Sequence, residues 1–448
     1  MQTKRCTVAG LVAANVLVVV SPTAASEEFL EVSSSVNPVL EWNQIFIDTL
    51  IATNTANSSS QRLGAIVHTA IFDAYNGIEQ RYTPIFFVNS DDRHGASRRA
   101  AVIAAAHTAL VGLFPSRQED LDSRHAASLE SLQSECESRS KFSFSSRRRS
   151  CLNRIEHGIS WGITVAQAVL AWRASDGFSA SYPAFTGGNA VGQWRPTPPA
   201  FGPMSAQGLA FTTMFVLSSN TQFRPGAPRG LTSVTYAADF NAVRALGRNT
   251  GSTRTDDQTA LAVFWEGNAS VHWNQAANQM AFANQLSMSA CNRLLAVLNI
   301  AMADTAFTTW SGKRFYGADL DEVTWRPVTS IPLADTDGNP DTEAESGWLP
   351  LINTPSHPEY PAGHPSLNGA AATVLLKYFR HARQTFTLTT TGQPNRTYSS
   401  IARARSDGNN GRVWGGMHYP STVRISDAEG EAIANYVNRN AMQKLLKE

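Results

Sequence analysis

Apolar residues recur at intervals of three and four along most of the chain, which is the spacing of one face of an α-helix. The segment 381–400, which contains FTLTTTG, is the one convincing strand candidate. Because helices predominate without βαβ alternation, we expect a mainly α protein of packed helix bundles with long Pro/Gly-rich loops. The predicted helices cover 37–53, 61–79, 97–114, 116–135, 153–175, 233–247, 256–267, 272–288, 290–312, 365–379 and 426–446.

A long stretch in the middle of the chain breaks the helical pattern. Residues 176–235 are rich in Gly, Pro, Ser and Thr, as in WRPTPPAFGPM and FRPGAPRGLTS, and predict a loop stiffened by proline. Loops of this length in compact proteins are usually functional or cover a site. Residues 333–349 predict a second, acidic loop.

The segment 290–312 is apolar on most sides and predicts a central helix. Asp304 lies inside it, and a buried carboxylate is costly unless it is paired. A structural partner is therefore expected, and one of the cations of the candidate site described below is a possible choice.

The first 25 residues have the organisation of a signal peptide. Lys4 and Arg5 form a charged start, an apolar core runs from Val8 to Val20, and small residues follow at 23–25. A membrane anchor is the alternative, but the apolar core is shorter than the roughly 20 residues that a span needs. We therefore expect a secreted or periplasmic protein with one helical domain, 26–448, and no membrane span after processing.

Composition narrows the class of function. The 448 residues carry a formal net charge of +1, and the 16% of charged residues form no basic stripe. This excludes a general nucleic-acid binder. Cys136 and Cys151 flank a Ser/Arg-rich loop, 138–150, and could pair in an exported protein. Cys291 would then be a buried thiol on a helix, and no Cys/His spacing suggests zinc.

The stretch HPEYPAGHPSLNG, which starts at His357, is the main candidate for chemistry. Its prolines predict rigid extended chain that turns at Gly363 and reaches His364. Pro365 occupies the position that proline prefers at the start of a helix. Free N–H groups and the positive dipole end of that helix favour an oxyanion. A Gly-His turn before a helix is also common without any function, so this stretch alone does not decide.

Two further stretches of the C-terminal part, 290–448, strengthen the case. One contains Lys313 and Arg326, and the other contains Arg412 and His418, six residues apart. Arginine pairs two oxygens at once, while lysine adds a point charge. Together with the helix N-terminus, these side chains would form a cage for a tetrahedral anion.

These motifs resemble the signature of the vanadium-dependent haloperoxidases, within the superfamily of the type-2 phosphatidic acid phosphatases and bacterial acid phosphatases. The family pattern is a Lys…Arg-Pro, a Pro-Ser-Gly-His, and an Arg followed six residues later by His. The similarity also extends to VLEWNQIFIDTLIAT, VHTAIFDAYNGIEQRYTP, AQAVLAWRASDG and WRPTPPAFGP, and so to nearly the whole mature chain. The matching residues are Lys313…Arg326-Pro327, Pro361-Ala362-Gly363-His364 and Arg412…His418.

The resemblance implies a role for each residue and vanadate, vanadium(V), as the cofactor. Lys313, Arg326 and Arg412 would neutralise the vanadate oxygens, and the Gly363 N–H would bind one more. His418 would be the nitrogen bonded to vanadium, and His364 the acid–base residue beside it. The implied partners are hydrogen peroxide and a halide, with an organic acceptor and an oligomer left open. Phosphate could occupy the same site.

The sequence departs from the family pattern at three places. Ala362 replaces the serine and removes a hydroxyl donor. The lysine and arginine are thirteen residues apart instead of seven, which fits an insertion within 317–324 and leaves Arg314 as a substitute for Lys313. The segment after His418 is lengthened before Asp427, so the partner of that histidine is left open.

His357 lies seven residues before His364, at a position that resembles the one held by histidine in bromoperoxidases and phenylalanine in fungal chloroperoxidases. A second imidazole there would bond the activated oxyanion or be protonated by it, which predicts oxidation of bromide and iodide with little chloride oxidation. Alternatively, His357 only packs in the proline-rich turn.

Two other classes of function are compatible with the same cage. An acid phosphatase would use His418 as the nucleophile on phosphorus and His364 as the general acid. A degenerate, exported helical protein without activity is the third option. Retention of both histidines and both arginines argues against it, and the similarity over the whole chain favours the haloperoxidase.

Overall fold

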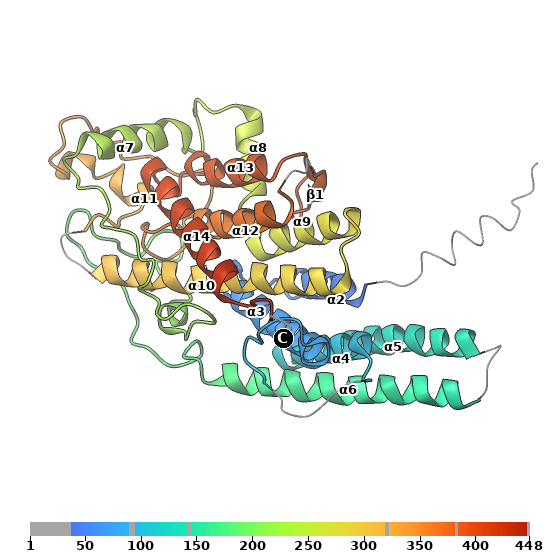
Figure 1. The fold of residues 1–448 in the computed structure, drawn as a ribbon. Helices are drawn as coiled ribbons and strands as arrows, with labels where there is room; N and C mark the ends of the chain where they lie inside the picture. Colours follow the sequence, from blue (N-terminus) through green and yellow to red (C-terminus); the bar gives the residue numbers. More distant parts are fainter. Residues whose placement is uncertain (1–36, 89–94, 141–144, 319–321, 381–383, 446–448) are drawn as a thin grey trace, which may run out of the picture. The chain divides into compact units, whose positions relative to one another are not determined.

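The core is organised around α10 (Met288–Ala318), which is buried along most of its length. It packs against α3 (Asn57–Glu79) on one side and against α12 (Gly363–Tyr378) and α14 (Pro420–Asn440) on another (Figure 1). The computed structural model describes residues 37–88, 95–140, 145–318, 322–380 and 384–445. From Pro38 onward these elements form one compact unit.

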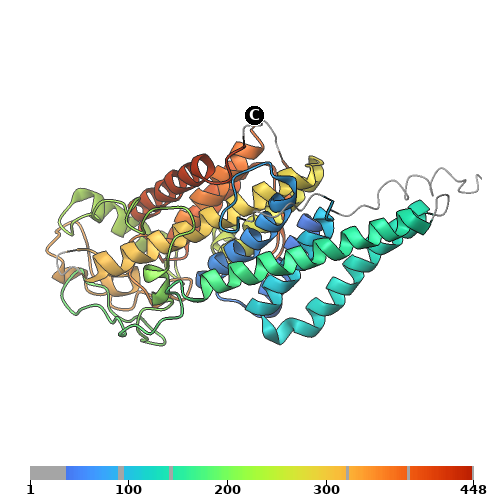
Figure 2. The same cartoon turned by 60° about the horizontal axis from the view of Figure 1, so that its bottom comes forward.

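The N-terminal helices form a bundle that contacts α10 through α3 and α2. It contains α2 (Pro38–Ala52), α3, α4 (Arg98–Leu113), α5 (Gln118–Ser140) and α6 (Ser145–Ala174). Ser97 caps α4 by accepting the Ala100 N–H. The α4 and α6 backbones lie unusually close, because a Cβ on Gly162 would approach the Ala101 carbonyl oxygen to 2.3 Å. Figure 2 shows α5 and α6 running beside each other as a long hairpin.

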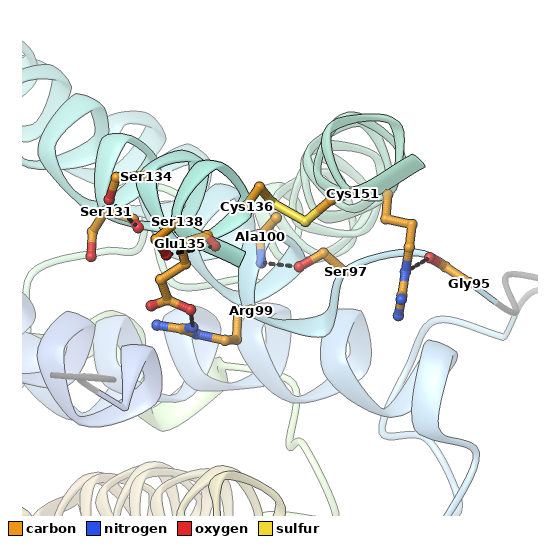
Figure 3. Close-up of a disulfide and its surroundings, with 11 residues drawn as sticks. Gly95, Ser97, Arg99, Ala100, Ser131, Ser134, Glu135, Cys136, Ser138 and Cys151 are labelled. Atoms are coloured by element: carbon orange, nitrogen blue, oxygen red, sulfur yellow. Dashed lines mark hydrogen bonds and ion pairs between the residues drawn. A yellow bond between two sulfur atoms is a disulfide. The ribbon is translucent and has the colours of Figure 1, made fainter. Parts of the chain in front are cut away.

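A disulfide joins Cys136 in α5 to Cys151 in α6, with the Cα atoms 5.9 Å apart (Figure 3). The predicted pairing is therefore present. The predicted loop 138–150 is largely wrong, because α5 continues to Ser140 and α6 begins at Ser145. Residues 141–144 lie outside the described chain. Cys291 is buried on α10, and its thiol lies 3.5 Å from the Leu286 carbonyl oxygen.

The C-terminal elements surround α12. The predicted strand region contains β1 (Phe386–Leu388) and β2 (Arg396–Tyr398), paired antiparallel with Phe386 opposite Tyr398. The predicted last helix, 426–446, begins earlier, because Pro420 occupies its first turn and places Ser426 inside it. The helix α13, which covers Ile401–Trp414, was not predicted. The remaining elements are α7 (Val234–Leu246), α8 (Asp256–Phe264), α9 (Ala269–Ala283), α11 (Pro327–Ser330), α13 (Ile401–Trp414) and the short 3-10 helices η1 (Pro115–Arg117), η2 (Gln207–Phe211) and η3 (Ala334–Thr336).

The long loop 176–235 has the expected character, with η2 and the start of α7 as its regular elements among the described residues. Asp304 anchors it from inside α10. The carboxylate accepts the backbone N–H groups of Phe215, Val216 and Leu217 at 2.7–3.0 Å. The suggestion that a site cation pairs with Asp304 was therefore wrong. Burial raises the pKa of Asp304 to about 6, and the three N–H groups oppose that rise.

Within the described residues, no single helix is long and apolar enough to cross a membrane. One pair, Arg98–Leu113 with Pro115–Ser138, passes the same test jointly but is bent by 117°.

Candidate active site

The N-terminus of α12 forms one wall of the site. The helix begins at Gly363, two residues earlier than predicted, so Gly363 and His364 are its first residues. Ala362 is the cap and offers no side-chain bond, and its own N–H donates to the Ser426 hydroxyl at 2.7 Å. A Cβ on Gly363 would lie 3.2 Å from the Trp310 ring, so the backbone approaches that tryptophan closely.

Arg326 connects three parts of the site. Its Nε donates to the His357 carbonyl at 2.9 Å, and its Nη2 donates to His357 Nδ1 at 2.8 Å. Nη1 donates to the Met417 carbonyl at 2.9 Å and lies 3.1 Å from His418 Nε2. Burial lowers the pKa of Arg326 to about 9, so the side chain stays cationic at neutral pH. Arg326 therefore links His357, Met417 and His418 by hydrogen bonds and also supplies a positive charge to the site.

His418 is held by Glu359, which sequence reasoning did not select. His418 Nδ1 lies 2.9 Å from Glu359 Oε1. The same carboxylate accepts the Tyr419 N–H at 3.1 Å and the Thr422 hydroxyl at 3.0 Å. A carboxylate in this position accepts a hydrogen bond from the Nδ1–H of a histidine, so the proton stays on Nδ1 and Nε2 keeps its lone pair.

Electrostatics keep the His418 ring neutral. Burial and the nearby cations Arg326 and Lys313 lower its pKa well below the usual value. Burial raises the pKa of Glu359 to about 7, while Arg326 and Lys313 favour its ionised form. The site therefore presents a neutral nitrogen whose electron pair faces an N–H group of Arg326.

Lys313, and not Arg314, points into the site. Its Nζ donates to the carbonyls of Pro358 and Glu359 at 2.7 and 3.2 Å, and the side chain is fully buried. Burial and Arg326 lower the pKa of Lys313 well below its usual value. Arg314 instead stacks over Phe185 at 4.2 Å and lines a surface pocket. The predicted insertion falls partly on residues 319–321, which lie outside the described chain.

Arg412 retains unused hydrogen-bonding capacity. Its Nη1 lies 3.4 Å from the Trp265 carbonyl, a long contact. Its Nε is buried and has no hydrogen-bond partner among the described residues. Burial lowers the pKa of Arg412 to about 10, so it remains a cation. Because buried donors are normally satisfied, an orphaned guanidinium nitrogen indicates a place for an anionic ligand.

His364 and His357 occupy different sides of the site. His364 Nε2 lies 3.4 Å from the Asn57 amide nitrogen and 3.3 Å from the Gly267 carbonyl. The His357 ring accepts from Arg326 and lies 5.2 Å from the Trp310 ring. Burial, Lys313 and Arg326 lower the pKa of His357 well below its usual value, so the expectation that it becomes protonated is not supported.

The comparisons with known proteins concern the fold. A family model described as the VCPO second helical-bundle domain matches residues 293–447. A search of the curated proteins finds no match. The crystal structure of the first bacterial vanadium-dependent iodoperoxidase is similar, with 21% identity and a TM-score of 0.72, over 91% of this chain and 98% of that chain. The holo-type bacterial vanadium-dependent chloroperoxidase has 16% identity and a TM-score of 0.63, over 86% and 92%. This chain has the vanadium haloperoxidase fold.

The segment that matches the haloperoxidase domain model, 293–447, contains every site residue selected from the sequence. The structure brings five of them into one buried cluster: Lys313, Arg326, His357, Arg412 and His418. Gly363 and His364 border it at the start of α12. Sequence reasoning missed Glu359 and Asn57. A glutamate between prolines inside a buried motif was a usable signal for the first, but nothing local marked the second.

Proposed function

We propose that this cluster holds vanadate and that the protein is a vanadium-dependent haloperoxidase. It would use hydrogen peroxide to oxidise bromide and iodide to hypohalous acid. The observation that carries the proposal is the His418–Glu359 pair. It leaves a neutral Nε2 electron pair 3.1 Å from an Arg326 nitrogen, inside a cage of cations.

The residues present fit vanadate, a tetrahedral oxyanion. Lys313, Arg326 and Arg412 would neutralise its oxygens, and the Gly363 N–H would contribute one more donor. His418 Nε2 would be the nitrogen ligand. The partnerless Nε of Arg412 supports this assignment, because an oxyanion would satisfy it. When bound, vanadate supplies a Lewis-acidic centre that activates peroxide toward a halide.

The protein's own residues have distinct tasks around this group. Glu359 keeps the proton on Nδ1 of His418 and so keeps Nε2 available. Arg326 fixes His357 and the backbone at Met417 on either side of the cage. His364, at the first turn of α12, would take or give a proton as peroxide enters and water leaves.

Ala362 makes the cage one donor poorer than the family pattern. Its N–H is already used by Ser426, and Ser366 donates its hydroxyl to the Ala362 carbonyl. One missing hydrogen bond to an anion is worth about 1–3 kcal/mol. The affinity for vanadate would therefore be lower than in a cage with serine.

The experiment that tests the function compares halide oxidation with phosphate-ester hydrolysis. Purified protein loaded with orthovanadate is assayed with peroxide and iodide or bromide, and the metal-free protein is assayed with an aryl phosphate. Halide oxidation that depends on vanadate supports the proposal. Ester hydrolysis without vanadate-dependent halide oxidation would assign the cage to a phosphatase instead.

We also propose that the protein is exported. The Cys136–Cys151 disulfide is compatible with an oxidising compartment and supports this placement. The mature chain would begin near Ser26. Mass spectrometry of the protein from its native host gives the answer directly, because an intact Met1 would contradict export by cleavage.

A further inference from the structure

The second histidine of the site is held by a pair of groups with opposite hydrogen-bonding character. His364 Nε2 lies 3.4 Å from Asn57 Nδ2 and 3.3 Å from the Gly267 carbonyl oxygen. The first group can only donate, and the second can only accept. Neither residue belongs to the motifs that the sequence pattern selected.

The orientation of the Asn57 amide is fixed by its other contacts. Asn57 Oδ1 accepts the Ala269 backbone N–H at 2.9 Å and the Gln61 side-chain amide at 3.2 Å. Because a backbone N–H is always a donor, the oxygen must face Ala269. The amide nitrogen is therefore the atom that faces His364. Asn57 lies in the first turn of α3 and Ala269 begins α9, so two helix ends brace this side chain.

The Gly267 carbonyl is fixed in the same region, in the turn between α8 and α9. Asn57 and Gly267 also line a cavity of about 430 Å³, together with Glu266, Asn268 and His272. Both hydrogen-bond neighbours of His364 Nε2 therefore lie at the wall of a cavity large enough for water and small solutes.

We propose that Asn57 is a positioning residue for His364. A bare Nε2 accepts the Asn57 amide N–H, and a protonated Nε2 donates to the Gly267 carbonyl. The imidazole thus has a partner in both states and does not need to turn when its proton occupancy changes. The consequence for halide oxidation rests on the proposed function, but the hydrogen-bonding arrangement does not.

Burial lowers the pKa of His364 well below its usual value, and four groups besides Asn57 also influence its charge. Arg412 on α13 and His272 on α9 disfavour the protonated ring, and the backbone carbonyls of Gly267 and Glu266 favour it. These groups are unchanged by a substitution at Asn57. A change in the state of Nε2 can then be assigned to the amide itself.

The test is Asn57→Asp. Aspartate keeps the oxygen that accepts from Ala269 and replaces the donor that faces His364 with an acceptor. We expect Nε2 to be protonated at a higher pH, by about one unit or more, in ring-nitrogen NMR of the metal-free protein with labelled histidine. The resonance is assigned by its loss in His364→Gln. The matched control is Asn268→Asp, which places the same charge at the start of α9, where Asn268 caps Ser270 and Val271 and makes no hydrogen bond to His364.

A second arm measures turnover. In the vanadate-loaded protein, Asn57→Asp should lower kcat for iodide oxidation by tenfold or more, within the range typical of general acid–base catalysis, with KM changed far less. An Nε2 titration in Asn57→Asp that matches both the parent and Asn268→Asp overturns the proposal. A different result is also informative: Asn57→Asp shifts the Nε2 titration, but neither the parent nor any variant oxidises halide. In that case Asn57 does position His364, and the haloperoxidase assignment is wrong.

Discussion

Glu359 and His418 form a buried pair, with 2.9 Å between the carboxylate Oε1 and the imidazole Nδ1. They are 59 residues apart in the chain and meet because the turn before α12 packs against the turn before α14. The pair decides which nitrogen of His418 is available, so it links the fold to the chemistry of the site.

The Glu359→Gln variant should bind vanadate about 10- to 100-fold more weakly, because an amide is a poorer acceptor and makes the ligand nitrogen less basic. Vanadate affinity is measured by titrating the metal-free proteins. The control is Glu429→Gln. Both carboxylates are buried and act on Lys313, but Glu429 bonds Thr309 and makes no hydrogen bond to His418. Equal losses in the two variants would show that the effect is not specific to the carboxylate that bonds His418.

Arg412 and Arg326 should respond differently to lysine. Arg412 makes one long hydrogen bond, so Arg412→Lys should change the free energy of unfolding by about 1 kcal/mol or less. Arg326 bonds two carbonyls and two histidines, so Arg326→Lys should cost at least about 2 kcal/mol. Both should lose halide oxidation, since lysine lacks the planar fork. Undiminished activity in Arg412→Lys would contradict a bidentate role for this arginine.

His357→Phe should change the halide profile. The parent is expected to oxidise iodide and bromide well and chloride weakly. Phenylalanine removes the acceptor for Arg326 Nη2 and frees that donor for the site. Rates with all three halides are measured in the parent and in the variant. Robust chloride oxidation by the parent, or the same profile in both proteins, would count against a role for His357 in halide choice.

Glu429 should make stability depend on pH. Burial raises its pKa from 4.5 to about 8, so the folded chain holds this proton more tightly than the unfolded chain. The stabilisation is complete below pH 4.5 and is lost as the pH rises toward 8, with a slope of about 1.4 kcal/mol per unit. Glu429→Gln should flatten this part of the curve. To test this prediction, the free energy of unfolding is measured for the parent and for Glu429→Gln at pH 5, 6.5 and 8. Parallel curves would show that Glu429 does not titrate in this range.

Most of the helices follow from local pattern and capping. Ser97 and Thr255 cap α4 and α8 by accepting backbone N–H groups of the first helical turn. Helix α13 was missed because its sequence, IARARSDGNNGRVW, has few apolar residues and two glycines. A Cβ on Gly408 would lie 2.7 Å from the Asn368 side chain, so this helix is held by close packing that one sequence cannot reveal.

Local sequence likewise marks some residues of the candidate site but not the partners that they contact. Gly363 and His364 are marked by local chemistry, a turn before a helix. Asp304 carried a local signal, since a carboxylate in an apolar helix needs a partner. Its partners, the N–H groups of 215–217, come from a loop almost ninety positions earlier and have no pattern of their own. The contact between Asn57 and His364 spans 307 positions and depends wholly on how the two bundles pack.

We propose that this chain binds vanadate through His418 and oxidises halide with it. The direct measurement is a titration of the metal-free protein with orthovanadate, during which bromide oxidation by peroxide is followed in the parent and in His418→Ala. Activity should rise with vanadate and saturate in the parent, and His418→Ala should show neither binding nor activity. Activity that is independent of vanadate, or a His418→Ala protein that binds and reacts like the parent, would contradict it.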